Sequence, residues 1–254
     1  MYSEEINKVC ASAIKKSEIL KKSKMRYLTA AALAGVYVGF GILLIFTIGG
    51  SFAAANSPAT KTIMGASFGI ALSLVIMAGS ELFTGNNMIM TIGSLEKKVS
   101  TLDSINIWTY SFIGNFVGAV VLSAIFVGAG LAKGSTASFI LKTSQVKMAM
   151  PSIELFLRGL LCNILVCLAV WCSIKLKEET AKLIMIFWCL FAFITIGFEH
   201  SIANMTLLSV ALMIPHTAAI SIGGLMHNLV WVTLGNFVGG AVFVGAAYWY
   251  VSKE

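Results

Sequence analysis

A carboxylate, an imidazole and an amide lie within six positions of one another in the stretch Glu199-His200-Ser201-Ile202-Ala203-Asn204. They belong to a run of 31 residues, Leu183 to Met213, in which Glu199 is the only formally charged side chain. An ionisable group is costly in so apolar a segment and is usually functional there. A histidine titrates near neutrality and can exchange a proton with a ligand. His200 is therefore the first candidate for a site.

The same spacing occurs once more in the chain, 118 positions earlier. The pattern Gly-x-Glu-x-x-x-x-Asn begins at Gly79 and again at Gly197, with Glu81 in the place of Glu199. A carboxylate stabilises the N-terminus of a helix, so we expect each glutamate to cap a half-helix that begins just after it. His200 has no such partner, because a leucine takes its place in the first copy.

Other polar groups in the two copies could complete a site. Thr84 carries a hydroxyl that could donate to a passing anion or hold His200 in one tautomer. Asn86, Asn87 and Asn204 are expected to satisfy backbone groups that a broken helix leaves free. Bulky apolar side chains surround both copies, which favours a small ligand.

The composition places these copies in a membrane. Of the 254 residues, 58% are hydrophobic and 11% are charged, and the mean hydropathy is +0.89. A soluble domain carries about a quarter charged residues. Apolar segments recur along the chain and predict an all-α membrane protein with six transmembrane helices: Tyr27–Ile48, Thr62–Leu95, Ile105–Ala132, Leu155–Ile174, Leu183–Met213 and Ser221–Val251.

Two of these segments are too long for one simple crossing. Thr62–Leu95 has 34 residues and Leu183–Met213 has 31, against about 20 needed, and each contains one copy of the polar pattern. A second repeated motif, Gly-Asn-Phe-Val-Gly, occurs at 114–118 and again at 235–239. The chain is thus predicted to consist of 3+3 inverted repeats, about 27–132 and 154–251, with broken second and fifth helices, an arrangement typical of transport pathways.

Helix packing is the competing explanation for the residues that recur in both halves, because small residues often mediate helix packing in membranes. We favour packing for the Gly-Asn-Phe-Val-Gly pair. For the two breaks it is the weaker explanation, because each contains a membrane carboxylate.

The basic residues predict the orientation. Thirteen Lys and Arg flank one side of the predicted crossings and five flank the other, which places both termini in the cytoplasm of a multi-pass plasma-membrane protein. Residues 1–26 carry apolar positions between lysines and predict an amphipathic helix at the cytoplasmic interface, ahead of a six-helix channel domain over residues 27–254. The lysines flank membrane segments, so the lipid bilayer, and no nucleic acid, is the expected partner.

Four motifs resemble the formate/nitrite transporter family: ELFT at 81–84, LCNILVCLAVW at 161–171, GFEHSIANM at 197–205 and VTLGN at 232–236. The resemblance extends over all six segments. It implies an aquaporin-like protomer in a homopentamer, each protomer with its own pore for a small monovalent anion, and no cofactor or metal.

The resemblance also implies roles for single residues. The central histidine of the family falls on His200 and the threonine of its membrane loop on Thr84. The constrictions fall on Phe68 and Phe193 outside and on Leu72, Leu82 and Phe83 inside. Positions near the histidine and in the vestibules fall on Glu199, Asn163, Asn228, Lys147 and Lys16.

The chain resembles the hydrosulfide channels of the family most, so hydrosulfide is the first expected substrate, with formate and nitrite as alternatives. Two mechanisms stay open. His200 could donate a proton so that the ligand crosses as its neutral weak acid, or the pore could bind the anion through hydrogen bonds. A passive channel is expected, and a proton-coupled formate or nitrite transporter is the alternative.

Two other classes are not favoured. An aquaporin would need two Asn-Pro-Ala motifs, and none of the three prolines follows an asparagine. A hydrolase is not expected, because His200 and Ser201 are chain neighbours and neither Gly-x-Ser-x-Gly nor His-Glu-x-x-His occurs.

Overall fold

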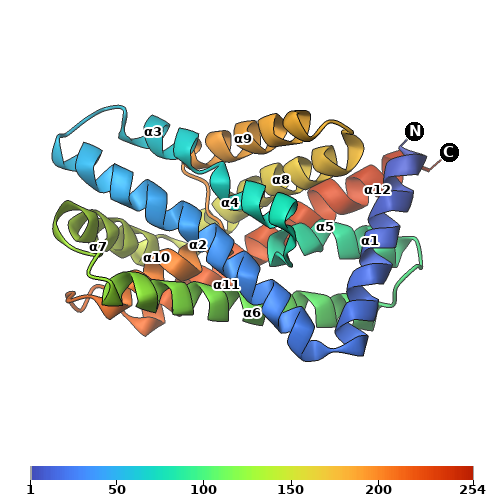
Figure 1. The fold of residues 1–254 in the computed structure, drawn as a ribbon, viewed down its shortest axis with the longest axis horizontal. Helices are drawn as coiled ribbons and strands as arrows, with labels where there is room; N and C mark the ends of the chain where they lie inside the picture. Colours follow the sequence, from blue (N-terminus) through green and yellow to red (C-terminus); the bar gives the residue numbers. More distant parts are fainter. Residues whose placement is uncertain (1, 254) are drawn as a thin grey trace.

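The structure, a computed structural model, describes residues 2–253, and within that range it consists of helices and connecting loops (Figure 1). The helices are α1 (Ser3–Lys22), α2 (Lys24–Ala54), α3 (Thr60–Ser67), α4 (Ile70–Leu74), α5 (Phe83–Leu95), α6 (Thr101–Gly128), α7 (Gly134–Ala149), α8 (Ser152–Lys175), α9 (Glu179–Ile196), α10 (Ser201–Met213), α11 (Ile222–Val238) and α12 (Ala247–Val251). Wider π-helical turns extend α4 at Val75–Gly79 and join α11 to α12 at Gly239–Ala246.

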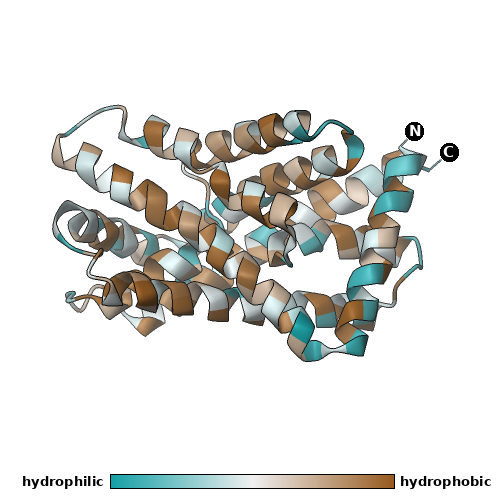
Figure 2. Ribbon diagram, in the orientation of Figure 1, coloured by the Kyte–Doolittle hydropathy of each residue, from teal (hydrophilic) through white to brown (hydrophobic). Residues whose placement is uncertain are grey.

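Six of these helical stretches are long and apolar enough to cross a membrane, as predicted. In the first half they are α2, the α3–α4 stretch to Gly79, and α6; in the second they are α8, α9 and the α11–α12 stretch. The shorter α5 and α10 complete the two broken crossings. Figure 2 shows hydrophobic colours along the long helices and hydrophilic colours on α1 and the loops at the ends.

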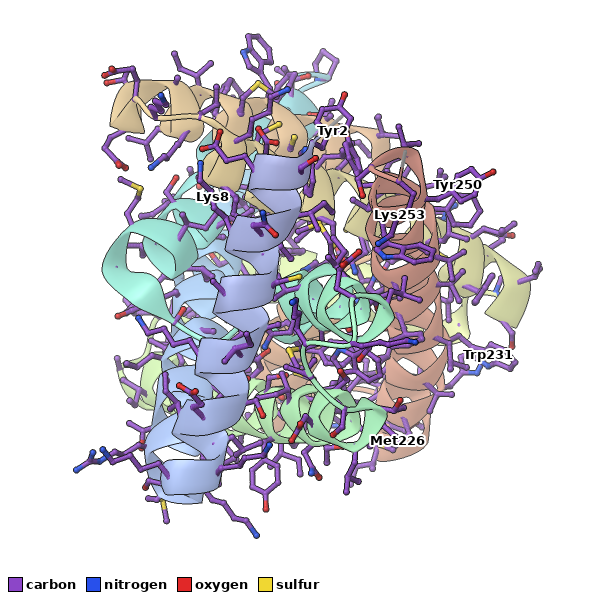
Figure 3. All side chains as sticks on the ribbon, turned by 90° about the vertical axis from the view of Figure 1, so that its right-hand side faces the viewer. Tyr2, Lys8, Met226, Trp231, Tyr250 and Lys253 are labelled. Atoms are coloured by element: carbon purple, nitrogen blue, oxygen red, sulfur yellow. The ribbon has the colours of Figure 1, made fainter. Side chains whose placement is uncertain are left out.

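The helix α1 lies across the end of the bundle at which both termini are found (Figure 1). Its apolar side chains, including Ile6, Val9 and Leu20, are buried, and the helix packs mainly against α5. Tyr2 packs edge-on against the rings of Trp171 and Tyr248, near the upper end of α1 in Figure 3. The prediction of an interfacial helix is therefore corrected in one respect: the protein itself covers the apolar face.

A second helix that does not span the membrane, α7, lies at the opposite end of the molecule (Figure 1). It occupies residues that the predicted repeats leave out, and it packs against α2 and α10. Its position in the chain, directly ahead of α8, matches that of α1 directly ahead of α2.

The first and third crossings of each half touch through glycines. A Cβ on Gly118 of α6 would lie 1.9 Å from the carbonyl oxygen of Ala32 in α2, and one on Gly239 would lie 2.2 Å from that of Leu160 in α8. Only glycine allows so close an approach of two backbones. The predicted packing role of these glycines is confirmed.

Each break begins at a glycine with a left-handed backbone. Gly79 has φ 80° and Gly197 has φ 93°. A short extended segment follows each glycine, after which α5 begins at Phe83 and α10 at Ser201. The glycine of the repeated pattern is thus the residue that stops each helix, because residues with a Cβ disfavour this conformation.

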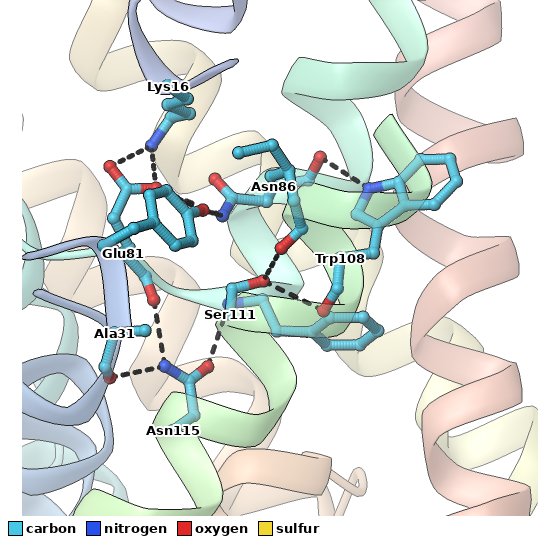
Figure 4. Close-up of polar contacts among 10 residues, drawn as sticks. Lys16, Ala31, Glu81, Asn86, Trp108, Ser111 and Asn115 are labelled. Carbon is cyan, nitrogen blue, oxygen red and sulfur yellow. Dashed lines mark hydrogen bonds and ion pairs between the residues drawn. The ribbon is translucent and has the colours of Figure 1, made fainter. Parts of the chain in front are cut away.

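A buried asparagine holds the first break in place (Figure 4). The Asn115 amide nitrogen donates to the carbonyl oxygens of Ala31 at 2.7 Å and Glu81 at 2.9 Å, and its oxygen accepts from the Phe83 backbone amide at 2.9 Å. One side chain therefore joins α2, the extended segment and the start of α5 to α6.

Asn236 repeats this arrangement in the second half. Its amide nitrogen donates to the carbonyls of Gly159 at 2.7 Å and Glu199 at 3.0 Å, and its oxygen accepts from the Ser201 amide at 2.9 Å. Both asparagines come from the Gly-Asn-Phe-Val-Gly pair. Packing explains the glycines of that pair, but as an explanation of its asparagines it is wrong, because they satisfy backbone groups at the breaks.

The left-handed glycine gives the first testable prediction. Apart from Gly197 itself and its two chain neighbours, no residue lies within 4 Å of a Cβ built on Gly197, so Gly197→Ala should destabilise the protein through backbone strain alone, by about 1–2 kcal/mol. Gly128→Ala is the matched control, because that glycine also has open space but no positive φ. Thermal unfolding in detergent micelles should show a lower midpoint for Gly197→Ala only, and equal midpoints would contradict the assignment.

The three hydrogen bonds that each of Asn115 and Asn236 makes across a break, here called an asparagine bridge, give a second testable prediction. Asn236→Leu removes three hydrogen bonds and leaves buried backbone groups without partners, so it should cost roughly 2–4 kcal/mol. Asn87→Leu is the control, because the Asn87 amide is equally buried and makes no hydrogen bond with residues 2–253. The same unfolding measurement should separate the two variants, and equal losses would show that the bridge contributes little.

Candidate functional site

The two half-helices start opposite each other, and their first turns bring Thr84 and His200 together. The distance from Thr84 Oγ1 to His200 Nε2 is 3.0 Å, and both side chains are buried. Thr84 is the second residue of α5, and His200 directly precedes α10. The histidine without a counterpart in the first repeat thus contacts the threonine of the first break.

The hydrogen bonds of His200 define which nitrogen carries the proton. The backbone amide of Ala203 donates to Nδ1 at 3.1 Å, so Nδ1 is an acceptor and carries no hydrogen. In the neutral ring the proton then sits on Nε2, which donates to Thr84 Oγ1. The Thr84 hydroxyl keeps its own hydrogen for another acceptor. His200 is therefore both the N-cap of α10 and a neutral donor.

Glu199 belongs to a closed ring of hydrogen bonds. Lys147 Nζ lies 2.6 Å from Glu199 Oε1, and the Asn204 amide donates to Glu199 Oε2 at 2.7 Å. The Asn204 amide also donates to Asn228 Oδ1 at 2.8 Å, and Asn228 donates to the Lys147 carbonyl at 3.1 Å. The ring ties α7, which carries Lys147, to α10 and α11.

Glu81 has a corresponding set of partners at the other break (Figure 4). Lys16 Nζ of α1 lies 2.8 Å from Oε1 and 2.7 Å from Oε2. The Tyr27 hydroxyl donates to Oε2 at 2.9 Å, and the Asn86 amide donates to both that hydroxyl and Oε2. No local pattern indicates a role for Tyr27, because its partner Glu81 lies 54 positions away.

The predicted capping role of the two glutamates is wrong. Among residues 2–253, neither carboxylate accepts a bond from a backbone amide of α5 or α10; each binds a lysine and an asparagine instead. The prediction that Asn86 and Asn204 satisfy the broken backbone with their side chains is wrong for the same reason. Asn115 and Asn236 do so, and their matched positions in the two repeats were the signal that could have identified them.

A cavity of about 310 Å³ leads to His200 from the end of the molecule opposite the termini. Its charged lining is Lys61, Lys147, Arg158 and Glu199. Aromatic and aliphatic side chains make up most of the remaining wall, and His200 lies at its inner end.

Behind this cavity the route narrows. The rings of Phe68 and Phe193 meet edge to face with centroids 5.5 Å apart, and a void of about 10 Å³ follows. Both phenylalanines line that void together with Leu72, Leu82 and His200. The structure thus brings four of the five predicted constriction residues around the histidine.

The fifth constriction residue, Phe83, is placed elsewhere. It lines neither the cavity nor the void, and its ring packs on Phe112 of α6 with centroids 5.3 Å apart. Asn163 also lies behind the route: its amide donates to the carbonyls of Thr84 at 3.2 Å and Asn236 at 2.6 Å. It connects the first half-helix with the asparagine bridge of the second half.

The polar groups along the route are those of hydrogen bonding and not of metal binding. Within residues 2–253 no three His, Cys, Asp or Glu side chains gather in a metal-type cluster. His200 lines both the cavity and the void, and Thr84 lies directly behind it, lining neither. Because the imidazole N–H is already bonded to Thr84 Oγ1, the hydrogen that the pair can offer a small ligand is that of the Thr84 hydroxyl.

Comparison with known proteins agrees with this architecture. The nitrite transporter NirC of Escherichia coli (strain K12) is 42% identical over 255 aligned positions, which cover 100% of this chain and 94% of that protein. A solved structure described as an FNT family ion channel superposes with a TM-score of 0.94 at 40% identity, covering 99% of this chain and 100% of its own. A second, described as a pentameric formate channel with formate bound, has a TM-score of 0.79 at 29% identity, covering 91% and 98%.

The family model described as formate/nitrite transporter matches residues 3–250, nearly the whole chain. The chain therefore belongs to the formate/nitrite transporter family, a family of transporters and channels.

Proposed function

We propose that the protein is a passive membrane channel for small monovalent anions of weak acids, with nitrite as its first substrate. The observation that carries this proposal is the contact between Thr84 and His200 behind the ring pair of Phe68 and Phe193. A hydroxyl donor that the imidazole N–H polarises, beside the narrowest part of an apolar route, suits a small anion that has lost most of its water.

The similar proteins support the choice of substrate. Their names refer to nitrite and formate. Hydrosulfide stays a prediction, since the donors at Thr84 and His200 do not distinguish it from these two anions. By the same comparison we propose a homopentamer with one pore in each protomer, in the plasma membrane, with α1 and both termini on the cytoplasmic side.

The geometry favours hydrogen bonding over proton donation by His200. To give up a proton and remain a neutral ring, His200 would first have to be an imidazolium, with hydrogens on both nitrogens. Its Nδ1 would then lose the bond from the Ala203 amide, a helix cap worth about 1 kcal/mol. In the neutral form, Nε2–H polarises the Thr84 hydroxyl, and that hydroxyl donates to the anion.

Substitution of the histidine separates the two mechanisms. His200→Asn keeps a good N-cap for α10, so the fold should persist. A lost neutral hydrogen bond of about 0.5–1.5 kcal/mol predicts a fall in nitrite flux of about tenfold or less, with an unchanged pH profile. Loss of a general acid would instead cost about 10²–10⁴-fold and alter the pH profile. Thr84→Val, of nearly the same shape, should show a similar fall to His200→Asn.

Flux into proteoliposomes tests the channel itself. Nitrite, formate and hydrosulfide should enter faster than into empty liposomes, down their own gradients and with no proton gradient, because a passive pore needs no coupling. Acetate should enter more slowly, since its methyl group must pass between Phe68 and Phe193. Strict dependence on a proton gradient would favour the coupled transporter. Nitrite entry no faster than into empty liposomes would refute nitrite as the substrate.

A further inference from the structure

The charged side chains in the inner part of the cavity that leads to His200 nearly cancel one another. Lys147, which lines the cavity, is paired with Glu199 at 2.6 Å, and the two side chains are only 17% and 3% exposed. Arg158, at the rim, is paired with Glu154 at 3.3 Å. An anion that approached either of these cations would have to compete with a carboxylate already in place.

Lys61 is the remaining cation of the cavity wall. It is exposed, it lines the cavity, and it forms no salt bridge with any of residues 2–253. The charge of Lys61 is therefore not cancelled by a neighbouring carboxylate.

The helix that carries Lys61 also carries part of the constriction. Lys61 is the second residue of α3, and Phe68 directly follows the last. Phe68 comes seven positions after Lys61, about two turns of helix, so both side chains project from the same face, about 10 Å apart along the axis. Close packing holds α3 on α9, because a Cβ on Gly65 would meet Thr195 Oγ1 at 2.2 Å. The backbone of Lys61 is thus held at a fixed place outside the gap between Phe68 and Phe193, within reach of which its side chain carries the charge.

We propose that Lys61 forms an outer capture site for small monovalent anions, from which they enter the constriction. The proposal rests on the channel function proposed above. An unpaired charge at the mouth of a narrow, low-dielectric cavity raises the local concentration of the opposite charge and the rate of entry. The Lys147–Glu199 pair, in contrast, contributes little net charge and acts by holding α7 and the second break in position.

Planar bilayer currents carried by sodium nitrite or sodium formate test this, with the concentration varied on one side at a time. On the side where α3 begins, Lys61→Gln should need about two- to fivefold more anion to reach half of the maximal current, with the maximal current unchanged. The difference should shrink as an impermeant salt is added, because salt screens an exposed charge. Titration from the other side should not differ from the wild type.

Lys133→Gln is the matched control. Lys133 lies at the same end, is exposed, and is unpaired within the described residues, but it does not line the cavity. Its variant should behave as the wild type. If wild-type currents appear but Lys61→Gln matches Lys133→Gln, or if Lys61→Gln lowers only the maximal current, the capture site is refuted while the channel stands. A wild type that passes neither anion refutes the channel and the capture site together.

Discussion

Backbone groups inside a membrane must find partners within the protein, and each of the two broken helices leaves some of them without a partner in the helix itself. Asn115 and Asn236 meet this requirement, each by joining two carbonyls and one amide across three segments. The extended segments that they hold lead directly into α5 and α10. The positions of Thr84 and His200 therefore depend on two amide side chains that line neither the cavity nor the void.

The charges of the site follow a second constraint, that a buried carboxylate needs a partner. Glu81 and Glu199 each receive a lysine from a helix that does not span the membrane, and each also accepts from an asparagine of its own half-helix. The Lys147–Glu199 pair lines the cavity, and no charged side chain lines the void at the ring pair. An anion that passes the constriction therefore meets a polarised hydroxyl, which attracts it without holding it as tightly as a cation would.

The sequence was sufficient for the features that local patterns encode. Segment length and the repeated Gly-x-Glu pattern located both breaks, and the missing counterpart made His200 a candidate site residue, which the structure places against Thr84. Tyr27 and the two asparagine bridges depend on partners 32 to 84 positions away, which no local pattern contains. The burial of the apolar face of α1 depends in the same way on α5, far along the chain. A carboxylate at the start of a helix commonly caps it, but here lysines from α1 and α7 bind both carboxylates instead.

The placement of α1 and α7 has a consequence for how the chain is connected. Each half has its own surface helix, lysine, glutamate and asparagine bridge, and the link between the halves is the short loop 129–133. Both termini lie at the other end of the molecule, where Tyr2 packs on Tyr248 and Lys253 pairs with Glu96. The contacts of the pore therefore do not depend on which half comes first in the chain. A circularly permuted chain, opened in that loop and joined between the present termini, would retain all of them.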